Sequence, residues 1–132
     1  MATIKSYSDL QQSKKLADIL PLESADMEYM FLKRDNSMVS RVPFIKDGYE
    51  EPDCSYNMVP CWSLAALLEI IPKHIKGYNV LRIDIGDNDT SIWYYEVGCG
   101  VNNNLPDITM KYTVDACVAM IIKLHEQKLL LL

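Results

Sequence analysis

The sequence has neither a recognisable export signal nor a long apolar run. Its first fifteen residues, MATIKSYSDLQQSKK, contain no apolar segment and no small-residue cleavage site of the kind that ends a signal peptide. No apolar run approaches the roughly 20 residues that a helix needs to cross a bilayer. The four leucines at 129–132 are too few, and we expect them to pack against the protein or a second copy. These features predict a cytoplasmic protein without a membrane partner.

Basic residues are in deficit. The chain has 13 lysines and arginines against 18 aspartates and glutamates, which gives a formal net charge of −5. An acidic surface is repelled by the phosphate backbone of nucleic acids and by anionic membranes. The charge therefore disfavours nucleic-acid binding, and the partners we expect are another protein or a second copy of this chain.

Closely spaced metal ligands are also missing. The four cysteines (Cys54, Cys61, Cys99 and Cys117) include no CxxC pair, and structural zinc usually takes its ligands in such pairs. In a reducing cytosol they are expected to be free thiols, and a buried cysteine behaves as a small hydrophobic residue. We therefore expect no metal and no cofactor.

Three segments carry helical signals. The first begins at Ser8, which is followed three residues later by a glutamine in a capping-box pattern, and ends at Pro21. The second begins at Pro60, because a proline in the first turn loses no hydrogen bond, and ends at Pro72. The third is capped by Thr113 and runs to about residue 128. Its apolar arc is wide, which is typical of a central core helix.

Strand signals lie between the helices. Residues 27–32 read as a strand, and residues 38–42 as an extended return segment after a polar turn. Residues 78–85 and 92–97 alternate apolar and polar side chains on either side of a Gly-Asp-Asn-Asp turn, which predicts an antiparallel hairpin.

This order of elements predicts an α+β fold. Without regular alternation of strands and helices, the arrangement we expect is a small antiparallel sheet, made of a β-hairpin and one or two further strands, with about three helices packed on it. The 132 residues suffice for one hydrophobic core, so residues 1–132 are expected to form a single domain.

Residues 46–60 predict an irregular acidic loop. This segment contains one glycine, two prolines and four acidic residues against a single lysine. Loops of this length are often functional, and aromatic residues are enriched at protein interfaces. The candidate binding residues are the aromatic and acidic side chains in and beside this loop: Trp62, Tyr49, Tyr56, Glu50 and Glu51.

Cys61 is the one candidate catalytic residue. At the start of the second predicted helix, the helix dipole would lower the pKa of its thiol. A cysteine nucleophile also needs a base within hydrogen-bond reach. His74 lies thirteen residues further on, about 20 Å away if the helix continued straight. A cysteine packed at a helix end is therefore the favoured interpretation.

His125 falls on the apolar face of the third predicted helix. It is too far from Cys117 to pair with it, because eight residues span about 12 Å along a helix. A single histidine on an apolar face is more often a hydrogen-bonded core residue than a ligand, and we expect a packing role for it.

Three stretches resemble motifs in small uncharacterised proteins of gut bacteria and of their phages and mobile elements. They are residues 16–27 (LADILPLESADM), 60–68 (PCWSLAALL) and 115–126 (DACVAMIIKLHE). No activity, cofactor or catalytic residue is assigned to that group. The resemblance implies a setting among the accessory genes of phages or mobile elements.

Together these features favour a non-enzymatic protein-interaction protein of a phage or mobile element. Two alternatives stay open: a thiol enzyme that uses Cys61, and a small-ligand-binding protein with a pocket between sheet and helices.

Overall fold

The computed structural model describes residues 5–46, 55–76, 79–101 and 104–130. The helices are α1 (Leu10–Ala17), α2 (Leu64–Ile70), α3 (Thr113–Glu126) and the short 3-10 helix η1 (Leu22–Ser24). The strands are β1 (Met27–Leu32), β2 (Phe44–Ile45), β3 (Tyr56–Cys61), β4 (His74–Ile75), β5 (Asn79–Ile85), β6 (Thr90–Glu96), β7 (Gly100–Val101) and β8 (Ile108–Met110).

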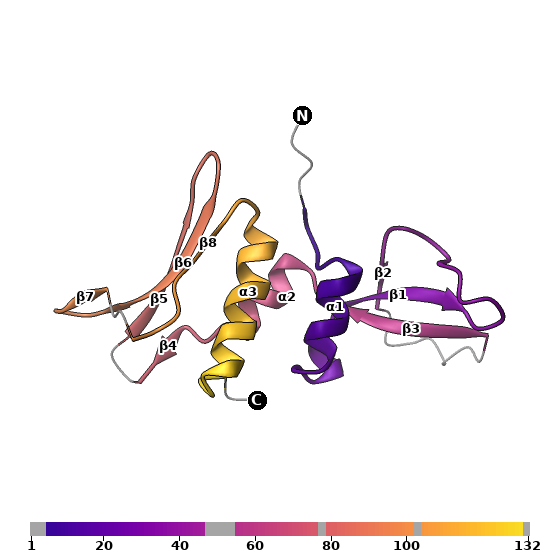
Figure 1. Ribbon diagram of the computed structural model, residues 1–132, viewed down its shortest axis with the longest axis horizontal. Helices are drawn as coiled ribbons and strands as arrows, with labels where there is room; N and C mark the ends of the chain where they lie inside the picture. The colour runs from indigo at the N-terminus through magenta and orange to yellow at the C-terminus, as the bar shows by residue number, and fades with distance from the viewer. Residues whose placement is uncertain (1–4, 47–54, 77–78, 102–103, 131–132) are drawn as a thin grey trace.

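The helices lie between two separate antiparallel sheets (Figure 1). A five-stranded sheet has the order β4-β5-β6-β7, with β8 also paired to β6, and packs on α3. A three-stranded sheet has the order β2-β1-β3 and packs on α1. The predicted α+β class is confirmed, with the difference that the strands form two sheets on opposite sides of the helices. Each sheet therefore has one face toward the helices and one face away from them.

The predicted hairpin is confirmed as β5 and β6. The two strands pair along their whole length, from Asn79 opposite Glu96 to Ile85 opposite Thr90. The amide of Gly86 donates to the carbonyl of Asp89 across the turn at 2.8 Å. Because side chains alternate along a strand, Ile92 and Tyr94 point toward α3 and are buried.

The second predicted helix begins later than expected. Its N-cap is Ser63, whose hydroxyl accepts from the amide of Ala66 and is also bonded to the carboxylate of Asp26. The start predicted at Pro60 is wrong, since Pro60 and Cys61 lie in β3. β3 is an edge strand, and an edge tolerates proline where the missing N–H would face away from the neighbouring strand and donate no hydrogen bond to it.

The expected loop at 46–60 is also corrected, because Tyr56–Cys61 forms β3. Residues 47–54 of that segment lie outside the described residues. The predicted return segment at 38–42 contributes only a single bridge, between Phe31 and Met38, and the pairing strand is β2 further along.

The first helix is capped by Asp9 and not by Ser8. The carboxylate of Asp9 accepts from the amide of Gln12, and the Gln12 side chain accepts from the amide of Asp9, which is a complete capping box. Ser8 is fully buried instead.

The helix α3 is the central core helix, as the sequence predicts. Seven of its side chains are buried: Val114, Ala116, Cys117, Val118, Met120, Ile121 and Leu124. Its first turn is preceded by Tyr112 as N-cap, and the Thr113 hydroxyl is bonded to the hydroxyl of Thr90 on β6 at 2.8 Å. None of the helices in the described ranges has the length and apolar content needed to span a bilayer.

Candidate interaction surface

The central strand of the three-stranded sheet, β1, carries large apolar side chains on both of its faces. On the face toward α1, Tyr29 and Phe31 are buried against Tyr7 and Leu10. The Tyr29 hydroxyl donates to the carbonyl oxygen of Ser8 at 2.9 Å, which ties the sheet to the segment before α1. This inner face forms a small hydrophobic cluster of its own.

The outer face of the same sheet carries apolar side chains around one carboxylate, that of Glu28, which lies opposite Phe44 and Pro60. In an antiparallel pair, residues opposite each other point to the same side. Met30 is opposite Met58, and Leu32 is opposite Tyr56. Phe44 joins them, because it is opposite Glu28, two residues before Met30 on β1. We call this set, Met30, Leu32, Phe44, Tyr56 and Met58, the methionine face.

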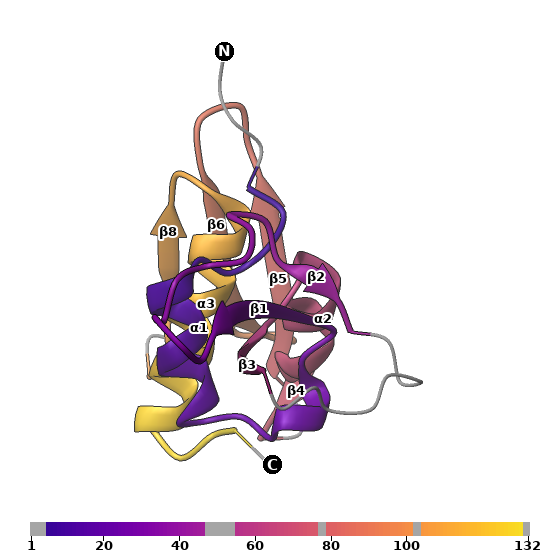
Figure 2. The same cartoon turned by 90° about the vertical axis from the view of Figure 1, so that its right-hand side faces the viewer.

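The methionine face remains open to solvent to a considerable extent. Met58 keeps 42% of its surface exposed and Phe44 keeps 40%, while Met30, Leu32 and Tyr56 are half-buried among their neighbours. Figure 2 views the molecule from the side of this sheet. Contiguous apolar surface of this kind on a folded protein marks interaction sites. Methionine is over-used at adaptable binding surfaces because its thioether chain is flexible and polarisable.

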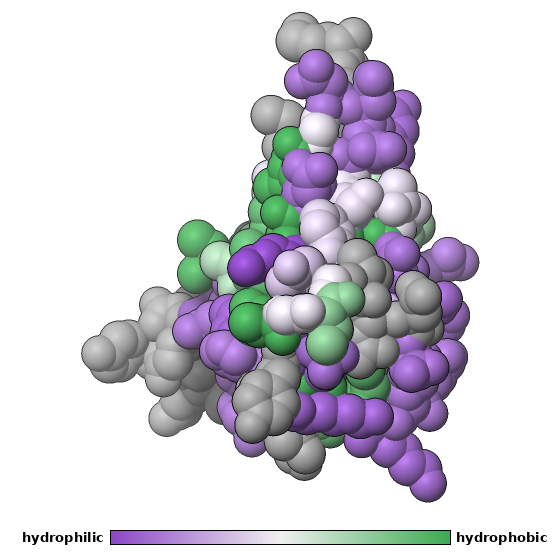
Figure 3. Space-filling view, turned by 90° about the vertical axis from the view of Figure 1, so that its left-hand side faces the viewer, coloured by the Kyte–Doolittle hydropathy of each residue, from purple (hydrophilic) through white to green (hydrophobic). Residues whose placement is uncertain are grey.

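The outer face of the five-stranded sheet is different in character. Arg82 on β5 lies over the ring of Tyr95 on β6, with 5.9 Å from the guanidinium carbon to the ring centre. The hydroxyls of Ser91 and Thr109 are bonded across β6 and β8 at 2.9 Å. Figure 3 shows this side of the molecule, where hydrophilic side chains dominate the hairpin tip and apolar residues are interspersed below it. Trp93 and Tyr95 also lie on this outer face, so it mixes aromatic side chains with charged and hydroxyl groups, whereas the methionine face has Glu28 as its charged residue among the paired strands.

A buried polar network lies beneath the three-stranded sheet. The hydroxyl of Ser8 is bonded to that of Ser13 at 2.8 Å and accepts from the amide of Trp62 at 3.1 Å. The Cys61 thiol donates to the carbonyl oxygen of Ser8 at 3.3 Å. No buried polar side-chain atom in the described part of the chain lacks a hydrogen-bond partner. The polar groups of this network therefore all have hydrogen-bond partners, and the network connects the N-terminal segment, α1 and β3.

Cys61 does not have the environment of a nucleophile. It is the last residue of β3 and fully buried, and it lies before the N-cap of α2, Ser63, and not in the first turn of that helix. Burial raises the pKa of its thiol, which favours the unreactive protonated form. Both histidines are exposed, His74 on β4 and His125 on α3, and neither belongs to the network around Cys61. The prediction of a core position for His125 is wrong.

The predicted binding residues separate into three groups. Trp62 is fully buried, with its indole N–H bonded to the Ser24 hydroxyl at 3.0 Å, so it belongs to the core and not to a binding surface. Tyr56 lies on the methionine face. The other three, Tyr49, Glu50 and Glu51, lie outside the described residues.

The pattern of side chains in the first strand indicates the methionine face, whereas the predicted binding residues were chosen for aromatic and acidic character. Residues 27–32 read MEYMFL, in which Met30 and Leu32 alternate with Tyr29 and Phe31. A strand with one face toward water normally shows polar residues at every second position. After Glu28 the alternation is lost, which indicated a strand with apolar side chains on both faces.

No group of three or more histidine, cysteine, aspartate or glutamate side chains in the described ranges is arranged to hold a metal ion. Comparison of the chain with protein-family models, with curated proteins and with solved structures finds no match. The assignment of a function therefore depends on the surfaces described above.

Proposed function

We propose that this chain is a non-enzymatic protein-interaction protein that docks a partner protein on the methionine face. The observation that carries the proposal is an apolar sheet face in which Met58 and Phe44 keep about two fifths of their surface exposed although the opposite face of the same sheet is packed. Burying apolar side chains of this size against a partner is favourable by roughly 25 cal/mol for each Å² removed from water.

The charge of the chain indicates the chemistry of the partner. The connection that joins β2 to β3 carries four acidic residues, Asp47, Glu50, Glu51 and Asp53, and the whole chain has a net charge of −5. Opposite charges steer association and suppress wrong partners. The partner that fits is a protein with an apolar patch beside basic side chains. Tyr49, Glu50 and Glu51 lie outside the described residues and stay predicted binding residues.

The environment of Cys61 favours this proposal over a thiol enzyme. A catalytic thiol needs a lowered pKa and a nearby base, whereas the Cys61 thiol is buried and donates to a backbone carbonyl. An accessory role in a phage or mobile element is part of the proposal, and its support is the resemblance of residues 16–27, 60–68 and 115–126.

The test is an affinity capture that compares three forms of the protein. Tagged wild type, Met58→Glu and Val97→Glu are each incubated with a lysate of the host, and bound proteins are identified by mass spectrometry. Val97 is the matched control, because it is 65% exposed and follows β6 of the other sheet. We expect a stoichiometric partner that Val97→Glu retains and Met58→Glu loses.

Two outcomes would overturn the proposal. If the captured protein binds Met58→Glu as well as wild type, the methionine face is not the docking site. If the wild type captures nothing and sediments as a monomer at high concentration, the chain is not an interaction protein under these conditions. If the captured partner is a second copy of this chain, and Met58→Glu no longer dimerises, the methionine face mediates self-association and not binding of a different protein.

A further inference from the structure

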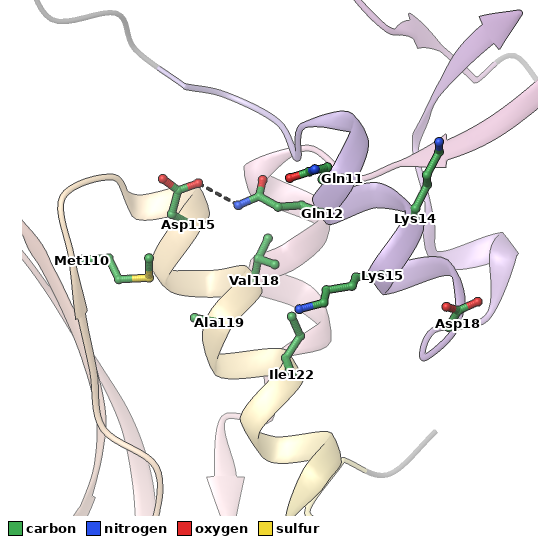
Figure 4. Close-up of a pocket in the computed structure, with 10 residues that line it drawn as sticks. All are labelled: Gln11, Gln12, Lys14, Lys15, Asp18, Met110, Asp115, Val118, Ala119 and Ile122. Carbon is green, nitrogen blue, oxygen red and sulfur yellow. Dashed lines mark hydrogen bonds between the residues drawn. The ribbon is translucent and has the colours of Figure 1, made fainter.

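A second surface feature is a groove between α1 and α3 with a volume of about 630 Å³ (Figure 4). It lies between the helices, away from the strands that form the methionine face. Side chains of α1 form one wall, and α3 with the end of β8 forms the floor and the other wall. This volume falls within the range of about 300–1,000 Å³ that is typical of small-ligand sites.

The floor of the groove is the one part of the apolar arc of α3 that its neighbours leave uncovered. Other sides of α3 pack against β6, β8 and α2. Ala119 and Ile122, however, are only half-buried, and with Val118 and Met110 they line the groove. α1 crosses this arc with few contacts, so an apolar channel remains between the two helices.

The two ends of the channel differ in charge. At one end, Asp115 accepts from the side chains of Lys5 and Gln12, so that its charge is already paired. Toward the other end, Lys15 extends across the groove above Ile122, as Figure 4 shows. Within the described ranges, no carboxylate lies at ion-pairing distance from the Lys15 ammonium. An anion in the groove would therefore place its charge at Lys15 and not at Asp115.

We propose that this groove binds the carboxylate of a medium-chain fatty acid, with the carboxylate at Lys15 and the alkyl chain along Ile122, Val118 and Met110. The eight residues of α1 span about 12 Å, which matches an extended chain of about ten carbons. The amphipathic character of the site fits this ligand, because the apolar floor takes the chain and the unpaired ammonium takes the head group. This site is independent of the methionine face.

Asp18 provides a test of the orientation of the fatty acid in the groove. It also lines the groove and is the C-cap of α1, three residues after Lys15. Its negative charge weakens the attraction of the groove for a carboxylate. If the head group lies at Lys15, removing the charge of Asp18 strengthens binding.

The experiment is a titration of ¹⁵N-labelled protein with sodium decanoate below its micelle concentration, followed by amide chemical shifts. We expect saturable shifts confined to α1, α3 and the end of β8. Lys15→Gln weakens binding by about threefold to fivefold, as for a partly exposed ion pair. Lys33→Gln leaves the affinity unchanged, because Lys33 is exposed, follows β1 in the other part of the molecule and does not line the groove. Hexanoate binds at least about tenfold more weakly, because its chain is shorter by four methylenes.

Three further results bear on the proposal. Asp18→Asn is expected to strengthen decanoate binding, and 1-decanol is expected to bind more weakly than decanoate. Ala119→Trp fills the groove and should abolish the shifts while the circular dichroism spectrum stays native. Absence of saturable shifts with wild type, equal affinity of Lys15→Gln and Lys33→Gln, or shifts located on the methionine face would each overturn the assignment.

Discussion

The thiol of Cys61 and the backbone carbonyl of Ser8 are joined by a 3.3 Å hydrogen bond, although 53 residues separate them in the sequence. The bond links the end of β3 to the segment before α1. The Ser8 hydroxyl strengthens the same link, since it accepts from the amide of Trp62 and is bonded to the Ser13 hydroxyl. Cys61, which its position at the start of a predicted helix made a candidate nucleophile, thus connects two segments of the fold.

Removal of the Ser8 hydroxyl is expected to destabilise the protein. Ser8→Ala leaves the buried amide of Trp62 and the Ser13 hydroxyl without this partner, which costs about 1–3 kcal/mol. The measurement is the free energy of unfolding in urea. Ser6→Ala is the control, because Ser6 is exposed, and it should change the free energy by less than about 0.5 kcal/mol. Equal stabilities of the two variants would show that the network does not contribute.

The thiols are expected to react in an order set by burial. Cys99 is exposed, whereas Cys61 and Cys117 are buried. Burial also raises the pKa of both buried thiols, to about 11 for Cys117, so their thiolate fraction at pH 8 is small. Among these three cysteines of the described ranges, iodoacetamide should therefore modify Cys99 first in native protein, and Cys61 and Cys117 only on unfolding. Peptide mass spectrometry reads out the order. Fast modification of Cys61 below pH 8 would restore the thiol-enzyme alternative.

Alkaline pH is expected to destabilise the fold through Cys117. Its pKa rises from about 9 in the unfolded chain to about 11 in the folded protein, because burial disfavours the thiolate. The stability contributed by the protonated thiol is complete below pH 9 and is lost as the pH rises to 11. By linkage the loss is about 2 kcal/mol at pH 11. Cys117→Ala should show a shallower decline of unfolding free energy between pH 8 and pH 11 than wild type.

A matched control accompanies this measurement. Cys99→Ala removes an exposed thiol and should leave the alkaline decline as in wild type. Because the buried Tyr29 and Tyr94 also have raised pKa values, part of the decline above pH 10 remains in both variants. Parallel curves for Cys117→Ala and wild type would contradict the assignment.

The two faces of the three-stranded sheet are expected to respond differently to truncation. Tyr29→Ala opens a cavity on the packed inner face and removes a hydrogen bond to Ser8, which costs roughly 3–5 kcal/mol. Met58→Ala on the outer face should cost less than about 1 kcal/mol, because the side chain is already 42% exposed. Thermal or urea unfolding of the two variants measures the difference. A large loss for Met58→Ala would mean that the outer face supports the fold itself.

Much of the secondary structure follows from local pattern. The strand at 27–32 is found with the predicted limits, and the hairpin of β5 and β6 follows from its alternation and turn residues. The helix α3 follows from a wide apolar arc over fourteen residues. In these segments the local propensity and the burial pattern agree, so the sequence suffices to predict them.

The wrong limits have identifiable causes. Pro60 is favourable both in the first turn of a helix and on an edge strand, and the pairing of β3 with β1 decides between them. Ser8 and Asp9 are both good N-cap residues, and burial of Ser8 in the network leaves Asp9 to cap α1. His125 lies on the exposed side of the last turns of α3. Because the helical wheel of this segment is apolar nearly all round, it does not show which side faces solvent.

The sequence by itself determined the α+β class, the central helix and the hairpin, because each depends on residues close together in the chain. The tertiary structure alone decided which surfaces remain free. Met30 lies opposite Met58, and Lys15 lies beside Ile122. Both placements result from contacts between segments that are far apart in the sequence. It also decided that Cys61 and Trp62 are core residues, because their burial results from packing of the N-terminal segment against β3 and α2. Such long-range packing selects among local alternatives that are close in free energy, so no local pattern encodes it.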